Sequence, residues 1–337
     1  MKRYKISTIL SVLGLIGLII IFYINRGQLK SVFHLLGDLR WYVIVLVCVV
    51  QIFSYWVNGL YYRSILRIFG YEISIKRLFE GALATNFVNY ILPTAGMAGA
   101  GFLSQVLAKE VPRGKSVLTQ LMRYALSALA VLIMMPLGFV LILLSHDSAH
   151  PIVRVTIISA LVITVLAFII VGFIYQEKLL RHFLKWLINS LKRIFPKINI
   201  NGVRNFIDDF YAGFHAMVKQ KRNMLIPFSW SINYILIEIG TFYMAFLAFG
   251  KVIDPGIAIM AYLFANIASI LGGVFFSVGV FEVGMAGTLV ALGQPFAFAV
   301  SVTALYRVLN LLIGLPPGAF YYRKFLPKKT AGQNSTV

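Results

Sequence analysis

Four ionisable side chains occur inside long apolar segments of this chain. Two are basic, Arg123 and Arg307, and two are acidic, Glu238 and Glu282. A charged group at membrane depth marks a candidate functional site, because hydrocarbon offers it no hydration. A guanidinium can hold a phosphate through two parallel hydrogen bonds, and a carboxylate can neutralise that guanidinium or bind a cationic headgroup. These four residues therefore predict a buried site for a charged lipid headgroup.

Pairing among the same groups is the alternative explanation. Glu282 could neutralise Arg307, and Glu238 could neutralise either arginine, so that the charges would only fix helix packing. Arg307 lies well inside its apolar segment and is the stronger candidate, whereas Arg123 lies near the inner end of its segment and could extend to the interface. Four amides would line the site or make helix-to-helix hydrogen bonds: Asn86, Asn89, Asn266 and Asn310.

The composition is that of a membrane protein. Hydrophobic residues make up 60% of the 337 residues and charged residues only 12%, against about 45–50% and about 25% in soluble domains. Apolar runs long enough to cross hydrocarbon, roughly 20 residues, occur at 6–24, 41–61, 119–144, 152–175, 225–249 and 297–320, with a further run at 257–276. We expect an all-α, multi-pass protein of the plasma membrane, with about six crossing helices and residues 6–24 retained as an anchor.

The net charge of +20 does not indicate nucleic-acid binding here. Most of the lysines and arginines fall on one side of the membrane if both chain ends lie inside, and this is the usual bias of cytoplasmic segments. That orientation makes segment 81–108 enter and leave on the cytoplasmic face, and segment 257–293 on the outer face. We therefore expect two oppositely oriented re-entrant hairpins, each followed by an arginine-bearing span.

The hairpins form the core of a predicted inverted repeat, with halves at about 81–144 and 257–320. The same interval separates Pro93 from Arg123 and Ser277 from Arg307. Helix breaks are expected at residues that lack an N–H or a side chain, namely Pro93, Gly96, Gly99, Gly101, Gly272, Gly273, Gly279 and Gly284. Two alternatives remain open: 257–293 could cross fully, giving eight spans, or the glycines could mark close helix packing.

The rest of the chain supports a single integral membrane domain, 1–327. Residues 176–224 contain a basic amphipathic pattern that predicts a helix in the cytoplasmic interface, and residues 328–337 predict a disordered tail. The sequence has no HExxH or CxxC motif and no nucleotide-binding loop, so we expect no metal, no cofactor and no ATP hydrolysis by this chain.

Several of these segments resemble one family. The stretch Asn89-Tyr-Ile-Leu-Pro93, the run Ser-Val-Gly-Val-Phe-Glu-Val-Gly at 277–284, Leu292-Gly293 and Arg307 are similar to the flippase-like membrane domain of lysylphosphatidylglycerol synthase/flippase proteins and of many stand-alone bacterial and archaeal membrane proteins. The resemblance covers roughly 8–322. The chain departs from the family pattern at Ala98, where an acidic residue is common, and at Ser277, where proline is common.

The resemblance implies movement of a lipid across the membrane. In the aminoacyl-lipid members, a soluble domain transfers lysine from lysyl-tRNA to phosphatidylglycerol, and that domain is missing from this chain. We therefore expect a flippase for an anionic phospholipid or lipid-linked substrate, working by alternating access. The alternatives are a phosphatidylglycerol lysyltransferase-type protein, and a membrane scaffold for a separately encoded synthase or glycosyltransferase.

Overall fold

The computed structural model describes residues 39–91, 97–145, 221–272 and 279–326, together with residues 158 and 162. Within these ranges the chain is helical and contains no strand. The helices are α3 (Trp41–Ile68), α4 (Ile75–Ile91), α5 (Met97–Val106), α6 (Arg113–Ser145), α10 (Lys221–Ala248), α11 (Pro255–Gly272), α12 (Val280–Ala291) and α13 (Phe296–Phe325). The protein is therefore an all-α membrane protein, as expected.

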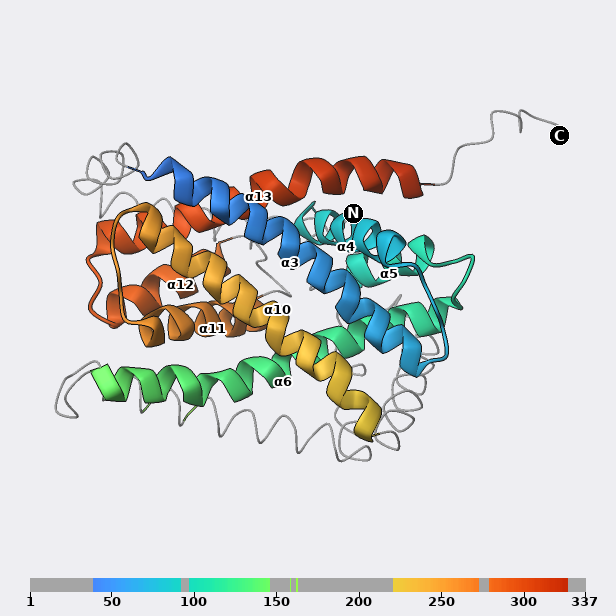
Figure 1. The fold of residues 1–337 in the computed structure, drawn as a ribbon, viewed down its shortest axis with the longest axis horizontal. Coiled ribbons are helices and arrows are strands. Elements are labelled where there is room, and N and C mark those ends of the chain that lie inside the picture. The colour runs from blue at the N-terminus through green and yellow to red at the C-terminus, as the bar shows by residue number, and fades with distance from the viewer. Residues whose placement is uncertain are drawn as a thin grey trace, which may run out of the picture.

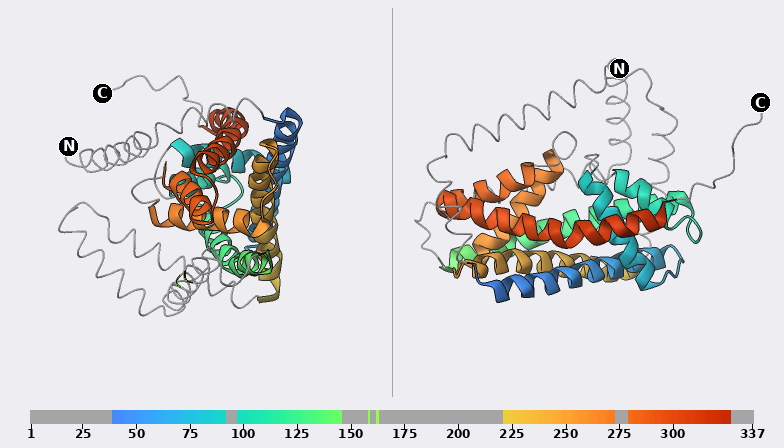
Figure 2. Two further views of the ribbon diagram at one scale, coloured as in Figure 1. Left: turned by 90° about the vertical axis from the view of Figure 1, so that its left-hand side faces the viewer. Right: turned by 90° about the horizontal axis from the view of Figure 1, so that it is seen from above.

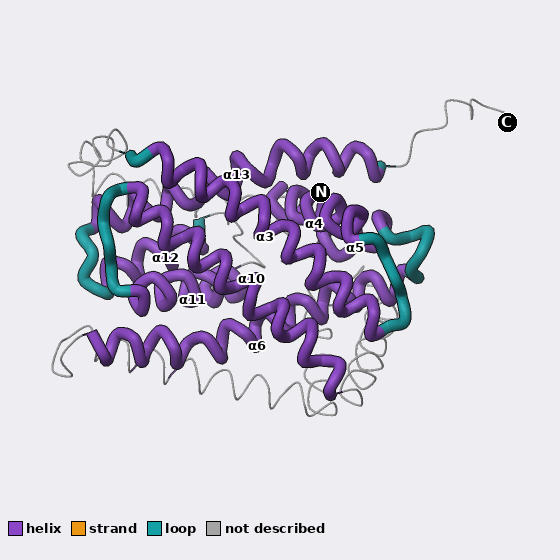
Figure 3. Tube along the Cα trace, viewed as in Figure 1, coloured by secondary structure: helices purple, strands orange, loops and turns teal. Residues whose placement is uncertain are grey.

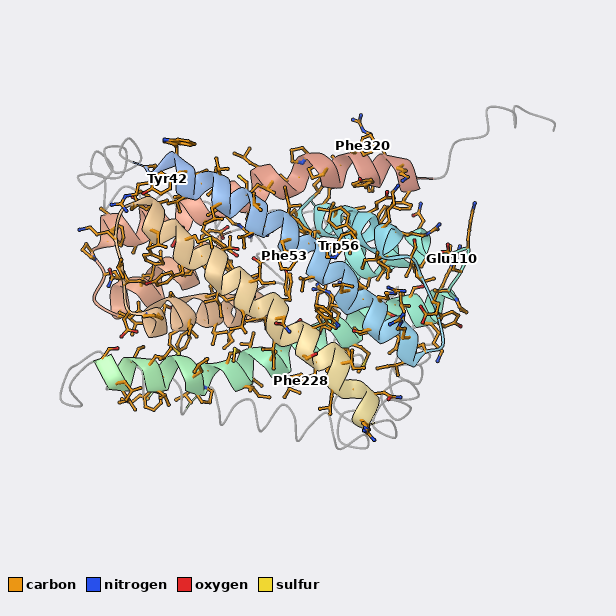
Figure 4. All side chains as sticks on the ribbon, viewed as in Figure 1. Tyr42, Phe53, Trp56, Glu110, Phe228 and Phe320 are labelled. Carbon is orange, nitrogen blue, oxygen red and sulfur yellow. The ribbon has the colours of Figure 1, made fainter. Side chains whose placement is uncertain are left out.

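In the part of the chain that the structure describes, four helices are long and apolar enough to cross a membrane, namely α3, α6, α10 and α13. They coincide with the predicted spans 41–61, 119–144, 225–249 and 297–320. Large apolar side chains cover their outer faces: Tyr42 and Phe53 on α3 and Phe320 on α13 are 55%, 54% and 67% exposed (Figure 4). Lipid contact explains this exposure, because a water-facing surface of this size would be unfavourable.

The helix contacts follow a two-fold pattern. Helices α3, α4, α5 and α6 correspond in order to α10, α11, α12 and α13, and every substantial contact among the described helices has its counterpart under this exchange. For example, α13 packs on α4 while α6 packs on α11, and α3 packs directly against α10. The repeat is therefore longer than the predicted halves 81–144 and 257–320, because each half also includes the preceding long helix.

The two short-helix hairpins lie at opposite ends of the bundle. In Figure 1 the hairpin of α4 and α5 occupies the right-hand end and that of α11 and α12 the left-hand end, and the view from above in Figure 2 agrees. Helices α5 and α12 have 10 and 12 residues, or about 15 and 18 Å, against a hydrocarbon thickness of about 30 Å. These lengths favour two re-entrant hairpins over eight full crossings.

The interruption between the two helices of each hairpin spans fewer residues than predicted. Helix α11 ends at Gly272, and Gly279 precedes α12 with φ of 101°, a backbone conformation that glycine adopts without a steric cost. Pro93, Gly96 and Gly273 lie outside the described residues.

Three of the predicted breaks are wrong. Gly99 and Gly101 lie within α5, and Gly284 lies within α12. At Gly99 a Cβ would overlap the side chain of Asn89, and at Gly284 it would come 2.9 Å from Ala268 Cβ. These two glycines therefore allow close packing between the legs of each hairpin, which was the alternative explanation for them.

Basic residues, among them Arg67, Arg77 and Lys324, lie at the end of the bundle that contains the α3–α4 and α5–α6 loops. We call this end the basic end. The loops meet there and at the opposite end (Figure 3). Arg77 pairs with Glu110 over 3.0 Å, and Lys324 pairs with Glu80 over 2.6 Å, which joins α4, the α5–α6 loop and α13. A hydrogen bond from Arg67 lowers the pKa of Glu72 in the α3–α4 loop.

Several sequence predictions lie outside the described ranges. These are the apolar runs 6–24 and 152–175 (apart from residues 158 and 162), most of the amphipathic segment 176–224, and the tail 328–337. The last residues of the amphipathic segment are an exception, because Lys221–Ala248 is one continuous helix. Residues 221–224 therefore belong to α10 rather than to a separate interfacial helix.

Candidate functional site

Arg307 and Glu282 form an ion pair between α13 and α12. The distance from Arg307 Nε to Glu282 Oε1 is 2.5 Å, and the two side chains keep 18% and 25% of their surface exposed. The second carboxylate oxygen of Glu282 accepts a hydrogen bond of 2.9 Å from the Gly279 N–H and so caps α12. This pairing is one of the alternatives that the sequence left open, and it fixes the position of the guanidinium beside the start of α12.

The first hairpin also reaches this arginine. The Tyr90 ring, at the end of α4, lies 5.2 Å from the Arg307 guanidinium, and Phe281 lies 5.2 Å from it on the second hairpin. The Tyr90 hydroxyl donates a 3.1 Å hydrogen bond to Asn310 Oδ1 on α13. Arg307 is therefore held between the two hairpins, by a carboxylate from one repeat and an aromatic face from the other.

Glu238 is the most enclosed acid of the described residues, at 3% exposure. Its Oε1 accepts hydrogen bonds from Gln51 Nε2 (3.1 Å) and Ser54 Oγ (2.5 Å) on α3. Its Oε2 accepts them from the Tyr306 hydroxyl (2.9 Å) and Asn310 Nδ2 (3.5 Å) on α13. Four neutral donors therefore stabilise this carboxylate, and no described ion pair includes it.

Asn310 connects Glu238 to the Arg307 site. Its amide nitrogen faces Glu238, while its oxygen accepts the hydrogen bond from Tyr90. The predicted residues Arg307, Glu282, Glu238 and Asn310 thus form one connected polar group. Asn266 contacts none of these four residues directly, and its amide donates to the Tyr262 carbonyl on its own helix.

Arg123 lies in a different environment. It is the eleventh residue of α6 rather than near the start of a span, because the helix begins at Arg113. Its side chain does not extend to the interface, since only 7% of the residue is exposed. The guanidinium lies 5.4 Å from the Tyr62 ring and 4.9 Å from the Tyr124 ring, and Asn58 Oδ1 accepts a long hydrogen bond of 3.5 Å from it.

Asn89 contacts Tyr124, whose ring lies against the Arg123 guanidinium. Its amide donates a 3.2 Å hydrogen bond to the Tyr124 hydroxyl, and its oxygen accepts one of 3.0 Å from the Gly99 N–H. The adjacent Tyr90 contacts Arg307 instead. The end of α4 therefore lies between the two arginines: Asn89 contacts the surroundings of Arg123, and Tyr90 contacts Arg307.

Sequence reasoning missed the uncharged residues of the site. Gln51, Ser54 and Asn58 lie on one face of α3, and the tyrosines at 62, 90, 124 and 306 surround the charged groups. The signal was the helical spacing of polar residues within an otherwise apolar segment. Among the described residues, no three His, Cys, Asp or Glu side chains gather into a possible metal site.

Comparisons with known proteins agree with a helical membrane protein. The chain is 23% identical over 326 residues to a UPF0104 membrane protein of Pyrococcus horikoshii, covering 93% of this chain and 94% of the relative. It is 25% identical over 179 residues to a UPF0104 membrane protein of Methanothermobacter thermautotrophicus, covering 51% and 53%. No solved structure matches. The chain matches the family described as lysylphosphatidylglycerol synthase TM region over residues 8–318, and it belongs to that family.

Proposed function

We propose that the protein moves a lipid or lipid-linked headgroup across the plasma membrane. The Arg307–Glu282 pair carries this proposal, because an ion pair at 18% and 25% exposure can exchange its carboxylate for a phosphate at little cost in contacts. The guanidinium would then bind the headgroup phosphate in place of Glu282. The family name refers to a lipid synthase, which supports a lipid rather than a soluble substrate.

The architecture supports alternating access. Two broken-helix hairpins at opposite ends of a pseudo-symmetric bundle are typical of transporters in which one half moves against the other. Arg307 contacts both hairpins, through Glu282 and Phe281 on one side and Tyr90 on the other. Binding of a phosphate would release Glu282 from Arg307, and this change at the hairpin junction would favour a rearrangement of one half relative to the other.

Transport can be tested in vesicles that contain the purified protein and a trace of headgroup-labelled anionic phospholipid. An impermeant reagent destroys the label in the outer leaflet only, so additional loss of signal reports movement from the inner leaflet. We expect the wild-type protein to make most of the label accessible within minutes.

Arg307→Ala should abolish this movement, while Arg323→Ala should leave it unchanged. Arg323 is an exposed residue near the end of the same helix, so it controls for the loss of one positive charge. Wild-type protein that leaves headgroup accessibility equal to that of protein-free vesicles would contradict the proposal, as would an Arg307→Ala variant of undiminished activity.

A further inference from the structure

Arg123 is a buried cation without a described counter-charge. It is 7% exposed, and none of the ion pairs among the described residues includes it. Two tyrosine rings and one long amide contact are its partners. A guanidinium removed from water normally needs an anion beside it, because desolvation of the charge is costly. Arg307 has such an anion in Glu282, and the described residues provide none for Arg123.

Hydrogen-bond donors are in excess around Arg123. Its own Nε, the Asn58 amide nitrogen and the Gln120 amide nitrogen are all buried and have no acceptor. The oxygen of the Gln120 amide is already occupied, because it accepts a 2.5 Å hydrogen bond from Tyr62, and the Asn58 oxygen faces Arg123. Native interiors rarely leave several buried donors unpaired. An acceptor-only group with negative charge would satisfy all three.

The pseudo-symmetry identifies which acids are missing. Helices α3 and α10 each have 28 residues, and, counted from the first residue of each helix, Asn58 holds the same position in α3 that Glu238 holds in α10. In the alignment that pairs Arg123 with Arg307, Ala98 replaces Glu282. At both positions the first half has an uncharged residue where the second half has a carboxylate. The first half therefore has the cation without either acid, which leaves the cation available to a ligand.

We propose that Arg123, Asn58 and Gln120 form a second anion-binding site, specific for a phosphate group, that is separate from the Arg307–Glu282 pair. Helix α3 provides Asn58, and α6 provides Gln120 and Arg123 one turn apart. A phosphate oxygen accepts several hydrogen bonds at once and carries the charge that Arg123 lacks. Identifying this ligand as the phosphate of a transported headgroup rests on the proposed function. Binding of inorganic phosphate does not require transport.

The test measures the melting temperature of the full-length protein in maltoside micelles, which contain no phosphate. Inorganic phosphate is added in one series and phosphatidylglycerol in the other. At saturation we expect phosphatidylglycerol to raise the Tm by roughly 5 °C. An equal rise with inorganic phosphate would show that the phosphate group alone is sufficient. Both results support the site, and a Tm that neither ligand raises overturns it.

Asn58→Asp is the decisive variant. It keeps the shape of the side chain but places a carboxylate beside Arg123, as Glu282 stands beside Arg307. We expect a higher Tm without ligand, and loss of the further rise on adding ligand. An unchanged ligand response in Asn58→Asp would overturn the proposal.

Arg123→Gln should also lose the ligand response, whereas Arg113→Gln, an exposed charge at the start of the same helix, should keep it. The vesicle assay is run separately on the same preparations. Ligand binding without lipid movement would contradict the proposed function only, and lipid movement without an Arg123-dependent rise in Tm would contradict the second site only.

Discussion

The Tyr306 hydroxyl donates a 2.9 Å hydrogen bond to Glu238 Oε2 and joins α13 to α10 inside the bundle. Tyr306 is 3% and Glu238 is 3% exposed. We expect Tyr306→Phe to lower the free energy of unfolding by about 2 kcal/mol, because it removes a hydrogen bond to a charged group and keeps the ring contacts. Chemical denaturation in mixed micelles measures the change. Tyr42→Phe, at 55% exposure, should have almost no effect on the free energy of unfolding. Equal losses in the two variants would show that the hydrogen bond from Tyr306 to Glu238 does not stabilise the protein.

The Arg307–Glu282 pair should show energetic coupling. We expect Arg307→Gln and Glu282→Gln each to reduce the free energy of unfolding by about 2 kcal/mol, since each leaves the opposite charge partly buried and unpaired. The double variant should lose less than the sum of the two, by about 1 kcal/mol. Glutamine at 282 retains an oxygen for the Gly279 N–H, so the helix cap does not confound the cycle. Simple additivity of the two losses would exclude a stabilising pair.

Two glycines allow close backbone contact at two equivalent helix crossings, that of α13 with α4 and that of α11 with α6. A Cβ on Gly318 of α13 would come 2.8 Å from the Leu83 carbonyl oxygen of α4, and one on Gly256 of α11 would come 2.7 Å from the Gly138 carbonyl oxygen of α6. Because the obstacle is backbone, we expect alanine at Gly318 or Gly256 to cost about 2 kcal/mol of folding stability.

Gly240→Ala provides the matched control for these crossings. Gly240 lies in α10, where an added Cβ meets nothing within 4 Å, so alanine there should be neutral or stabilising by up to about 1 kcal/mol. Thermal melting of the three variants in one detergent compares them directly. A destabilised Gly240→Ala, or a tolerant Gly318→Ala, would contradict the close approach of the helices.

The orientation of the two hairpins predicts opposite accessibility. Lys109 lies beside the first hairpin at the basic end, and Lys251 precedes the second hairpin at the opposite end; both are exposed. In a Cys48→Ala background, which removes the single cysteine, Lys251→Cys should react with an impermeant maleimide added to intact cells. Lys109→Cys should react only after the membrane is opened. Labelling of both positions from one side would disprove opposed hairpins.

The sequence predicted the apolar helices and the charged residues because both depend on local composition. Any span of roughly 20 apolar residues is long enough to cross hydrocarbon, and a lone charge within it is visible without a structure. The interval shared by Pro93–Arg123 and Ser277–Arg307 likewise predicted a repeat, and the contacts between the described helices follow a two-fold pattern. The start of α6 was missed because Arg113 and Lys115 are polar and still helical, and so Arg123 was placed too near the interface.

Only the tertiary structure decided which charges meet. Glu282 and Glu238 were equal candidates to neutralise Arg307, and their distance along the chain favoured neither. The crossing of α12 with α13 brought Glu282 to 2.5 Å from Arg307, while α3 and α13 provided Glu238 with four neutral donors. A sequence lists the groups that need partners, but the packing of helices distant in the chain selects those partners, and here it left Arg123 with aromatic rings and amides.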